Sequence, residues 1–72
     1  MIRYANKSGY SDVNGFMLGK NFIRVQFNDG LIRTYNYRTA GEQNVENMKS
    51  LALKGEGLGT YIFHHTAYRY VK

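Results

Sequence analysis

Basic and aromatic side chains alternate between Asn21 and Tyr37, in the sequence NFIRVQFNDGLIRTYNY. Arginine and lysine bind phosphate groups, and aromatic rings stack on nucleic-acid bases. This composition is typical of a sheet that binds a phosphate-bearing ligand. The alternative is that the tyrosines pack in the core and the arginines are ordinary solvent-facing strand residues. The side chains with the right chemistry are Phe22, Arg24, Arg33, Tyr35, Tyr37 and Arg38.

A glycine-rich segment, GEGLG at residues 55–59, is a second candidate for phosphate binding. Backbone N–H groups at the start of a helix can hold an anion. Lys54 precedes the segment, and Thr60 and Tyr61 after it would add hydroxyl donors. The segment is not a P-loop, because no G-K-[ST] follows it and no strand precedes it. The alternative is that it forms only a helix C-cap and a turn.

The residue types that support metal binding or catalysis do not form a recognisable site. His64 and His65 are adjacent, so on a helix they lie about 100° apart, whereas zinc sites on helices prefer i, i+4 spacing. We expect one histidine to face the core and the other to face solvent. Ser8, Ser11 and Ser50 lie in no nucleophile motif, and the carboxylates form no obvious acid–base pair. We therefore predict a non-catalytic protein without a metal or a cofactor.

Length and charge limit the classes of protein that fit. The 72 residues form one domain, whose core is small. Because cysteine is absent, disulfides and Cys-based zinc sites are excluded, which fits a reducing compartment. Homo-oligomerisation would supplement the small core. Ten Lys and Arg against five Asp and Glu give a net charge of +5, which favours nucleic acid, a nucleotide or an acidic protein surface as partner. The alternative is that the charge serves only solubility.

The distribution of apolar residues predicts a cytoplasmic protein. Residues 1–12 are polar and contain no run that resembles a signal peptide. No stretch approaches the roughly 18 apolar residues that a membrane span needs. We expect no membrane partner, and, if the protein is viral, we expect it to act in the host cytoplasm.

Three strands should position the basic and aromatic residues. Residues 12–18 predict a strand with Phe16 and Leu18 on one face, and residues 21–28 and 31–38 predict a β-hairpin around Gly30. Together they form a three-stranded antiparallel meander. Residues 1–9 are expected to be a loosely ordered lead-in.

The length of the hairpin loop decides where the tyrosines lie. A two-residue loop at Asp29 and Gly30 would place Phe27 opposite Ile32, and it would put Tyr35 and Tyr37 on the face of Arg24. A three-residue loop would place Phe27 opposite Leu31 and put both tyrosines on the core face with Ile23 and Val25, because a one-residue shift flips every side chain. We favour the three-residue loop, since it separates apolar from polar residues more cleanly. The outer face would then carry Arg24, Gln26, Thr34, Asn36 and Arg38.

Helical patterns follow the strands. Thr39 and Glu42 match a T-x-x-E capping box, in which the Thr39 side chain caps a helix. Val45, Met48 and Ala52 form one apolar stripe, and Gly55 fits the position just after the helix. A second short helix is expected from about Thr60, with Gly59 near its N-cap. The last residues, AYRYVK, extend this helix or form an edge strand, and we favour the helix. The fold class is therefore α+β, with one amphipathic helix and a short C-terminal helix after the meander.

The order of these motifs resembles the KTSC domain. The pattern I-x-V-x-F-x-D-G runs from Ile23 to Gly30, Tyr35-Asn36-Tyr37 follows, and then come the helix, MKSLALKGEGL and TYI. The resemblance covers residues 8–70, and it implies that residues 1–72 form a single KTSC-like domain. This family occurs at the C-terminus of some lysyl-tRNA synthetases and as stand-alone bacterial and phage proteins. RNA binding has been suggested for it because of the synthetase context. We expect this chain to be a stand-alone form without a synthetase, and its aromatic tail, Tyr68-Arg69-Tyr70, departs from the family pattern.

The sequence therefore favours a non-catalytic basic module that binds RNA, DNA or a signalling nucleotide. An alternative is a phage-encoded anti-defence protein that blocks a host defence protein through a protein–protein contact. A variant of that alternative is a homo-oligomer that sequesters a cyclic nucleotide between its subunits. The expected phosphate ligands are Arg24, Arg38, Lys49 and Lys54, the expected stacking residues are Tyr35, Tyr37 and Tyr61, and the expected loop contacts are Gly57, Gly59 and Thr60.

Overall fold

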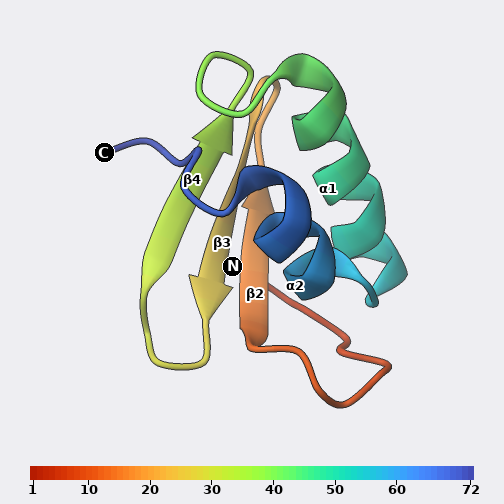
Figure 1. The fold of residues 1–72 in the computed structure, drawn as a ribbon. Coiled ribbons are helices and arrows are strands. Elements are labelled where there is room, and N and C mark those ends of the chain that lie inside the picture. The colour runs from red at the N-terminus through yellow and green to blue at the C-terminus, as the bar shows by residue number, and fades with distance from the viewer.

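The computed structural model describes residues 1–72 and contains an antiparallel sheet whose helices lie on one face (Figure 1). The strand order is β1-β2-β3-β4. Helix α1 follows the sheet, and a short helix α2 continues into a π-helical turn, η1. The predicted α+β fold with an antiparallel meander before its helices is confirmed. The elements are β1 (Ile2–Arg3), β2 (Val13–Leu18), β3 (Phe22–Phe27), β4 (Ile32–Asn36), α1 (Glu42–Lys54), α2 (Leu58–Tyr61) and η1 (Ile62–Thr66).

The prediction that residues 1–9 form a loose lead-in was wrong. Ile2 pairs with Phe16 and Arg3 pairs with Gly15, which adds β1 as a fourth strand beside β2. Gly15 permits this approach, because a side chain there would meet the Ile2 carbonyl oxygen at 2.9 Å. Tyr4, which follows β1, is buried in the core. The N-terminal segment is therefore part of the packed structure.

The β3–β4 hairpin has the three-residue loop that we favoured. The Phe27 N–H donates a hydrogen bond to the Leu31 carbonyl at 2.8 Å, and Gly30 has a φ of +90°. Gly30 adopts this left-handed conformation without a Cβ clash. Ile23 pairs with Tyr35 in the resulting register. This register places Tyr35 on the core face and Arg24 on the opposite face.

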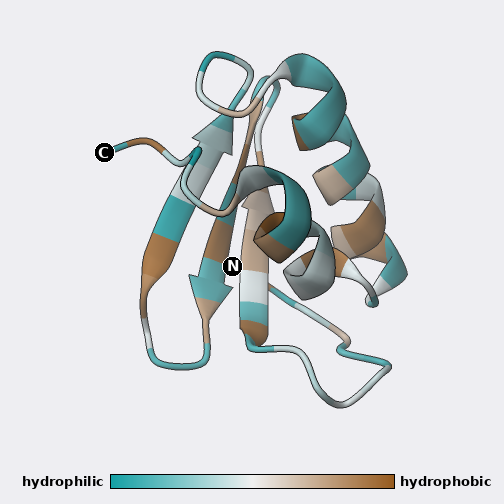
Figure 2. Ribbon diagram, viewed as in Figure 1, coloured by the Kyte–Doolittle hydropathy of each residue, from teal (hydrophilic) through white to brown (hydrophobic).

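The core lies between the sheet and the helices. Figure 2 shows the corresponding pattern, with hydrophobic segments in brown along the strands and on part of each helix, and hydrophilic turns of α1 in teal. Helix α1 packs against β3 and β4. None of the helices is long and apolar enough to cross a membrane. The sheet contributes Val13, Phe16, Ile23, Val25, Phe27 and Tyr35, and the helices contribute Val45, Met48, Ala52, Leu58 and Ile62.

Helix α1 carries the predicted apolar stripe but not the predicted capping box. Gly41 occupies the N-cap with a φ of +93°, and no side chain caps the helix. The Thr39 hydroxyl instead accepts a hydrogen bond from the Asn36 N–H at 3.2 Å. In return, Asn36 Oδ1 accepts a hydrogen bond from the Thr39 N–H at 2.8 Å. This local turn occupies the Thr39 hydroxyl before the helix begins, as Asn and Thr side chains often do in turns. At the other end, Gly55 is the predicted left-handed cap.

The last residues leave the helix, so the helical extension that we favoured was wrong. Helix η1 ends at Thr66, and the Arg69 N–H then bonds to the Thr66 carbonyl in a turn. The Val71 N–H donates to the Thr34 carbonyl of β4 at 2.7 Å. The Tyr70 ring packs edge-on against Tyr35, with 6.2 Å between ring centroids. These contacts hold the C-terminal segment beside β4 without making it a regular strand (Figure 1).

Candidate functional site

The face of the sheet opposite the helices is a candidate binding surface, which we call the open face. Paired residues of neighbouring strands share a face of a sheet, so the register arranges this surface in three rows. The rows lie about 7 Å apart, which is two residues along a strand. The first row is Arg3, Gly15, Gln26 and Ile32; the second is Met17, Arg24 and Thr34; the third is Phe22 and Asn36.

The charges on the open face are of one sign. Arg3 and Arg24 lie in adjacent rows, and no Asp or Glu belongs to any of the three rows. Asp12 precedes β2, Asp29 lies in the hairpin loop, and the three glutamates belong to α1 and the loop after it. Aligned cations without a neighbouring carboxylate create a positive potential that attracts anions.

The Arg24 side chain is held in a defined position on this face. Its Nε donates a hydrogen bond to Thr34 Oγ1 at 3.0 Å, and its guanidinium carbon lies 5.6 Å from the centroid of the Phe22 ring. The Phe22 ring in turn covers Gly19, where any Cβ would collide with it. This arrangement leaves the terminal nitrogens of Arg24 without a carboxylate partner. Met17 and Ile32 beside it are 39% and 49% exposed, which adds apolar surface.

The two hairpin tyrosines do not present free ring faces. Tyr35 is fully buried, so its ring cannot stack on a base, and burial raises the pKa of its hydroxyl. Tyr37 is half-buried against the core and donates a hydrogen bond to Glu46 Oε2 at 2.7 Å. This hydrogen bond, followed by desolvation, raises the Tyr37 pKa to about 12. The same bond, together with one from Lys49, lowers the Glu46 pKa.

The predicted lysine ligands are already paired. Lys49 Nζ lies 3.0 Å from Glu46 Oε2 and also donates to the Lys20 carbonyl at 3.0 Å. Lys54 Nζ lies 3.8 Å from Glu56 Oε1, at an exposed position where such a pair contributes little. Arg38 is exposed in the turn after β4 and its side chain forms no ion pair. Only Arg38 of these three therefore offers an unpaired cation.

Tyr61 holds α2 against α1. Its hydroxyl donates to Asn44 Oδ1 at 2.6 Å and accepts from Asn47 Nδ2 at 3.0 Å, and its ring lies 4.4 Å from that of His65. These contacts give Tyr61 a structural role. Both histidines are exposed, so the prediction that one of them faces the core was wrong. The π-helical turn at Ile62–Thr66 rotates Ile62 and Thr66 inward instead.

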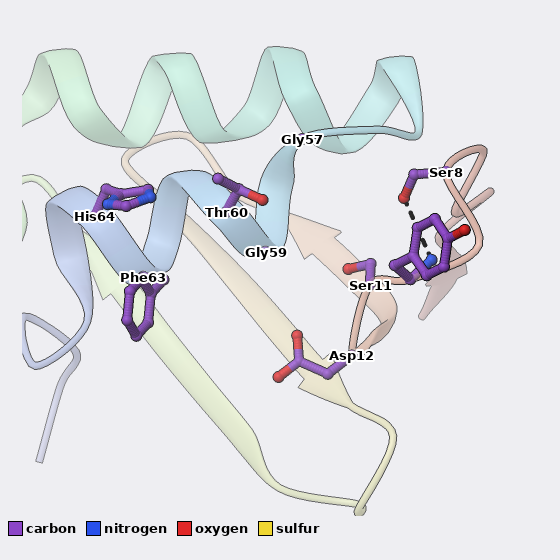
Figure 3. A pocket seen from close by; sticks show the side chains of 9 residues that line it. Ser8, Ser11, Asp12, Gly57, Gly59, Thr60, Phe63 and His64 are labelled. Carbon is purple, nitrogen blue, oxygen red and sulfur yellow. Dashed lines mark hydrogen bonds between the residues drawn. The ribbon is translucent and has the colours of Figure 1, made fainter.

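The glycine loop borders a cavity on the helix side of the sheet (Figure 3). Helix α2 begins at Leu58, two residues before the predicted start, so Gly57 is its N-cap and Gly59 lies within it; Thr60 lies on its exposed side. Asp12, from the segment before β2, lines the same cavity. A carboxylate at this position opposes phosphate binding, because like charges repel. The four-residue α2 is also a short helix with a small dipole.

The ten predicted ligand residues therefore do not form one site. Arg24 lies on the open face, whereas Gly57, Gly59 and Thr60 line a cavity behind the sheet. The hairpin and the glycine loop cannot hold the same small nucleotide, because the core separates them. Arg33 also lies on the helix side, where its guanidinium covers the Tyr70 ring at 4.3 Å. Arg3 was not predicted, since only its pairing with Gly15 brings it to the open face.

No family model, curated protein or solved structure matches this chain, and none of these comparisons identifies a KTSC domain.

Proposed function

We propose that this chain binds single-stranded nucleic acid along the open face of its sheet. The observation that supports this function is the row arrangement: Arg3 and Arg24 lie in adjacent rows, Phe22 follows in the third, and no carboxylate interrupts them. Sheets that bind single strands combine cations for the backbone with aromatic rings for the bases.

Each part of the open face has a role in this proposal. Arg3 and Arg24 contact phosphates, and the ring of Phe22 stacks on a base. Thr34 holds the Arg24 Nε at 3.0 Å, which reduces the side-chain entropy that Arg24 loses on binding. Met17 and Ile32 supply apolar contact to neighbouring bases. Lys20 and Arg38, in the two turns next to the third row, extend the positive surface beyond Phe22.

The role that we propose is binding without catalysis. The open face contains neither a carboxylate nor a histidine, so it has no group for acid–base chemistry or for a divalent metal. The resemblance to the KTSC domain makes RNA the first ligand to test, since that family accompanies some lysyl-tRNA synthetases. Protein inhibition and nucleotide sequestration are the competing functions.

Fluorescence anisotropy with a labelled oligouridine tests the proposal. We expect saturable binding that weakens as salt rises, because binding releases counterions from the phosphates. The slope of log K against log salt is negative. The double variant Arg3→Ala/Arg24→Ala should make it shallower by about 0.7 for each phosphate that the variant no longer neutralises. Phe22→Leu keeps the apolar volume but removes the stacking ring, and it should cost about 1–3 kcal/mol of binding.

A matched control removes the same charge elsewhere. Lys7 and Lys54 are exposed near the Gly55 end of the molecule and outside the open face, so Lys7→Ala/Lys54→Ala should leave the affinity nearly unchanged. Equal losses in the two double variants would show that net charge alone attracts the oligonucleotide. Retention of a host protein whose binding is insensitive to salt, without oligonucleotide binding, would favour the inhibitor function instead.

A further inference from the structure

A cavity of about 360 Å³ lies between the segment before β2 and the α2–η1 helices. Figure 3 shows Asp12 and Ser11 on one side and Thr60, Phe63 and His64 on the other. A second cavity of about 430 Å³ shares Asp12, Gly59 and Phe63 with the first. The two cavities therefore adjoin at Asp12, and we call the pair the Asp12 groove. The open face lies on the other side of the sheet and does not contribute to it.

The Asp12 carboxylate has no partner in the folded chain. It forms no ion pair and accepts no side-chain hydrogen bond, although the chain has ten Lys and Arg residues. It is the only Asp, Glu, Lys or Arg among the residues that line the first cavity. In the second cavity Arg33 is present, but its guanidinium lies over the Tyr70 ring instead of pairing with Asp12. The first cavity therefore has a single negative charge and favours a cation.

Exposed aromatic rings line the two cavities that adjoin at this carboxylate. Tyr10 is 94% exposed, Tyr68 is 82% exposed and Phe63 is 75% exposed, and each of them lines one or both cavities of the Asp12 groove. Tyr10 lines the first cavity, Tyr68 lines the second, and Phe63 lines both. Aromatic faces attract cations through the ring quadrupole, and several such rings together bind organic ammonium groups.

Gly59 sets the distance between the two walls of the groove. A Cβ at this position would lie 3.0 Å from Ser11 Oγ and 3.3 Å from Asp12 Oδ1. The absence of a side chain lets α2 approach the carboxylate closely. The hydroxyl of Thr60, on the same helix, borders the cavity and can accept a hydrogen bond from an N–H donor.

We propose that the Asp12 groove binds an alkylammonium group, with the ammonium in the first cavity, away from Arg33 of the second. Asp12 neutralises the charge, Phe63 and the flanking tyrosines contact the ammonium and its alkyl chain, and the Thr60 hydroxyl accepts one of its protons. A phosphate or carboxylate ligand would be repelled by Asp12. The alkylammonium group has two possible sources, a free polyamine or a lysine side chain of a partner protein. This site is independent of nucleic-acid binding, since no residue of the open face lines it.

The proposal is tested by adding each of two probes to the isotopically labelled protein and measuring the changes in its amide NMR shifts. Spermidine represents the free polyamine. Nα-acetyl-lysine methylamide, whose side-chain ammonium is free, represents the lysine side chain. We expect saturable shifts at Ser11, Asp12, Gly59 and Phe63 with at least one probe, and the tighter probe identifies the source. Asp12→Asn should weaken binding about tenfold, which corresponds to loss of one charged hydrogen bond. Phe63→Ala should weaken it about two- to fivefold.

Two surface substitutions serve as matched controls. Glu42→Gln removes one exposed carboxylate outside the groove, and Leu53→Ala removes one exposed apolar side chain of α1. Neither should change the affinity, and the NMR spectrum of each variant reports whether it is folded. Absence of saturable shifts with both probes would overturn the proposal, and so would equal weakening by Asp12→Asn and Glu42→Gln. Arg3→Ala/Arg24→Ala should leave this binding unchanged, whatever its effect on nucleic acid.

Discussion

The Leu58 N–H donates a buried hydrogen bond to the Tyr4 hydroxyl at 3.2 Å, across 54 positions of the chain. Leu58 is the first residue of α2, where the N–H groups of a helix have no partner within the helix. Gly57 before it offers no side chain as a cap. The segment after β1 therefore supplies the missing acceptor, and it joins the N-terminal strand to the C-terminal helices.

Removal of this hydroxyl should destabilise the protein. Tyr4→Phe leaves the Leu58 N–H buried without an acceptor, which costs about 1–3 kcal/mol. Tyr10→Phe is the control, because Tyr10 is 94% exposed and its hydroxyl forms no hydrogen bond. Urea denaturation of the three proteins measures the difference. Equal unfolding midpoints for Tyr4→Phe and the unsubstituted protein would show that water replaces the hydroxyl at α2.

Two glycines with similar backbone conformations should respond differently to alanine. Gly30 and Gly55 have φ values of +90° and +83°, so each substitution introduces left-handed strain of about 1–2 kcal/mol. The new methyl group at Gly30 would meet open space, whereas at Gly55 it would lie 2.6 Å from Ala5 Cβ. Gly55→Ala should therefore lower the free energy of unfolding more than Gly30→Ala. Chemical denaturation gives both values, and equal losses would mean that the Ala5 segment moves away readily.

The Tyr37–Glu46 hydrogen bond should make stability sensitive to alkaline pH. The Tyr37 pKa is raised from 10.0 to about 12 by this bond, so its stabilising contribution is present below about pH 10 and is lost as the pH rises through 12. The lowered Glu46 pKa acts at the acidic end, where its contribution is lost as the pH falls through that lowered value.

The absorbance of tyrosinate at about pH 11, between the two values, measures this coupling. Glu46→Gln should increase the absorbance by less than the equivalent of one tyrosine, because Tyr37 then ionises nearer its ordinary pKa. The same substitution in a Tyr37→Phe background should have no effect, and circular dichroism confirms that the fold persists. An equal increase in both backgrounds would assign the change to another tyrosine.

The buried hydroxyl of Tyr35 has no hydrogen-bond partner, and its removal should not destabilise the protein. Burial is the main cause of the raised pKa of this hydroxyl. The positive charge of Arg33 lowers the pKa in part, although Arg33 forms no hydrogen bond with the hydroxyl. Since an unpaired buried hydroxyl is costly, Tyr35→Phe should leave the thermal midpoint unchanged or raise it. Tyr35→Ala should cost about 3–5 kcal/mol by opening a cavity. A clear loss in Tyr35→Phe would show that the hydroxyl does have a partner.

Patterns among residues close in sequence predicted the strands and the helix that depend only on such neighbours. The strand at residues 12–18, the hairpin register around Gly30 and the apolar stripe of α1 each follow from residues close in sequence. Strand β1 was missed because two residues show no alternation, and its pairing depends on contact with Gly15. The capping box at Thr39 failed because Asn36, three residues earlier, competes for the same hydroxyl.

The candidate site was less predictable than the fold. Composition identified Arg24 and Phe22 as ligand candidates, and the register then placed both on the open face. Composition could not show that the glycine loop lies behind the sheet, because that depends on how α2 packs against the segment before β2. The Asp12 groove was missed for the same reason. Its residues come from positions 8–12 and 57–68 and from Phe27 and Arg33 of the hairpin, which only tertiary packing brings together.

The hydrogen bond between Val71 and Thr34 has a consequence for how copies of this chain meet. A free outer strand is a template on which another molecule can add its own strand, and proteins limit such growth by covering their edges. Val71 occupies part of the outer side of β4 at Thr34, and at the opposite border β1 is only two residues long. The chain thus protects both borders of its sheet against aggregation. Trimming or displacing its last three residues would uncover one of them.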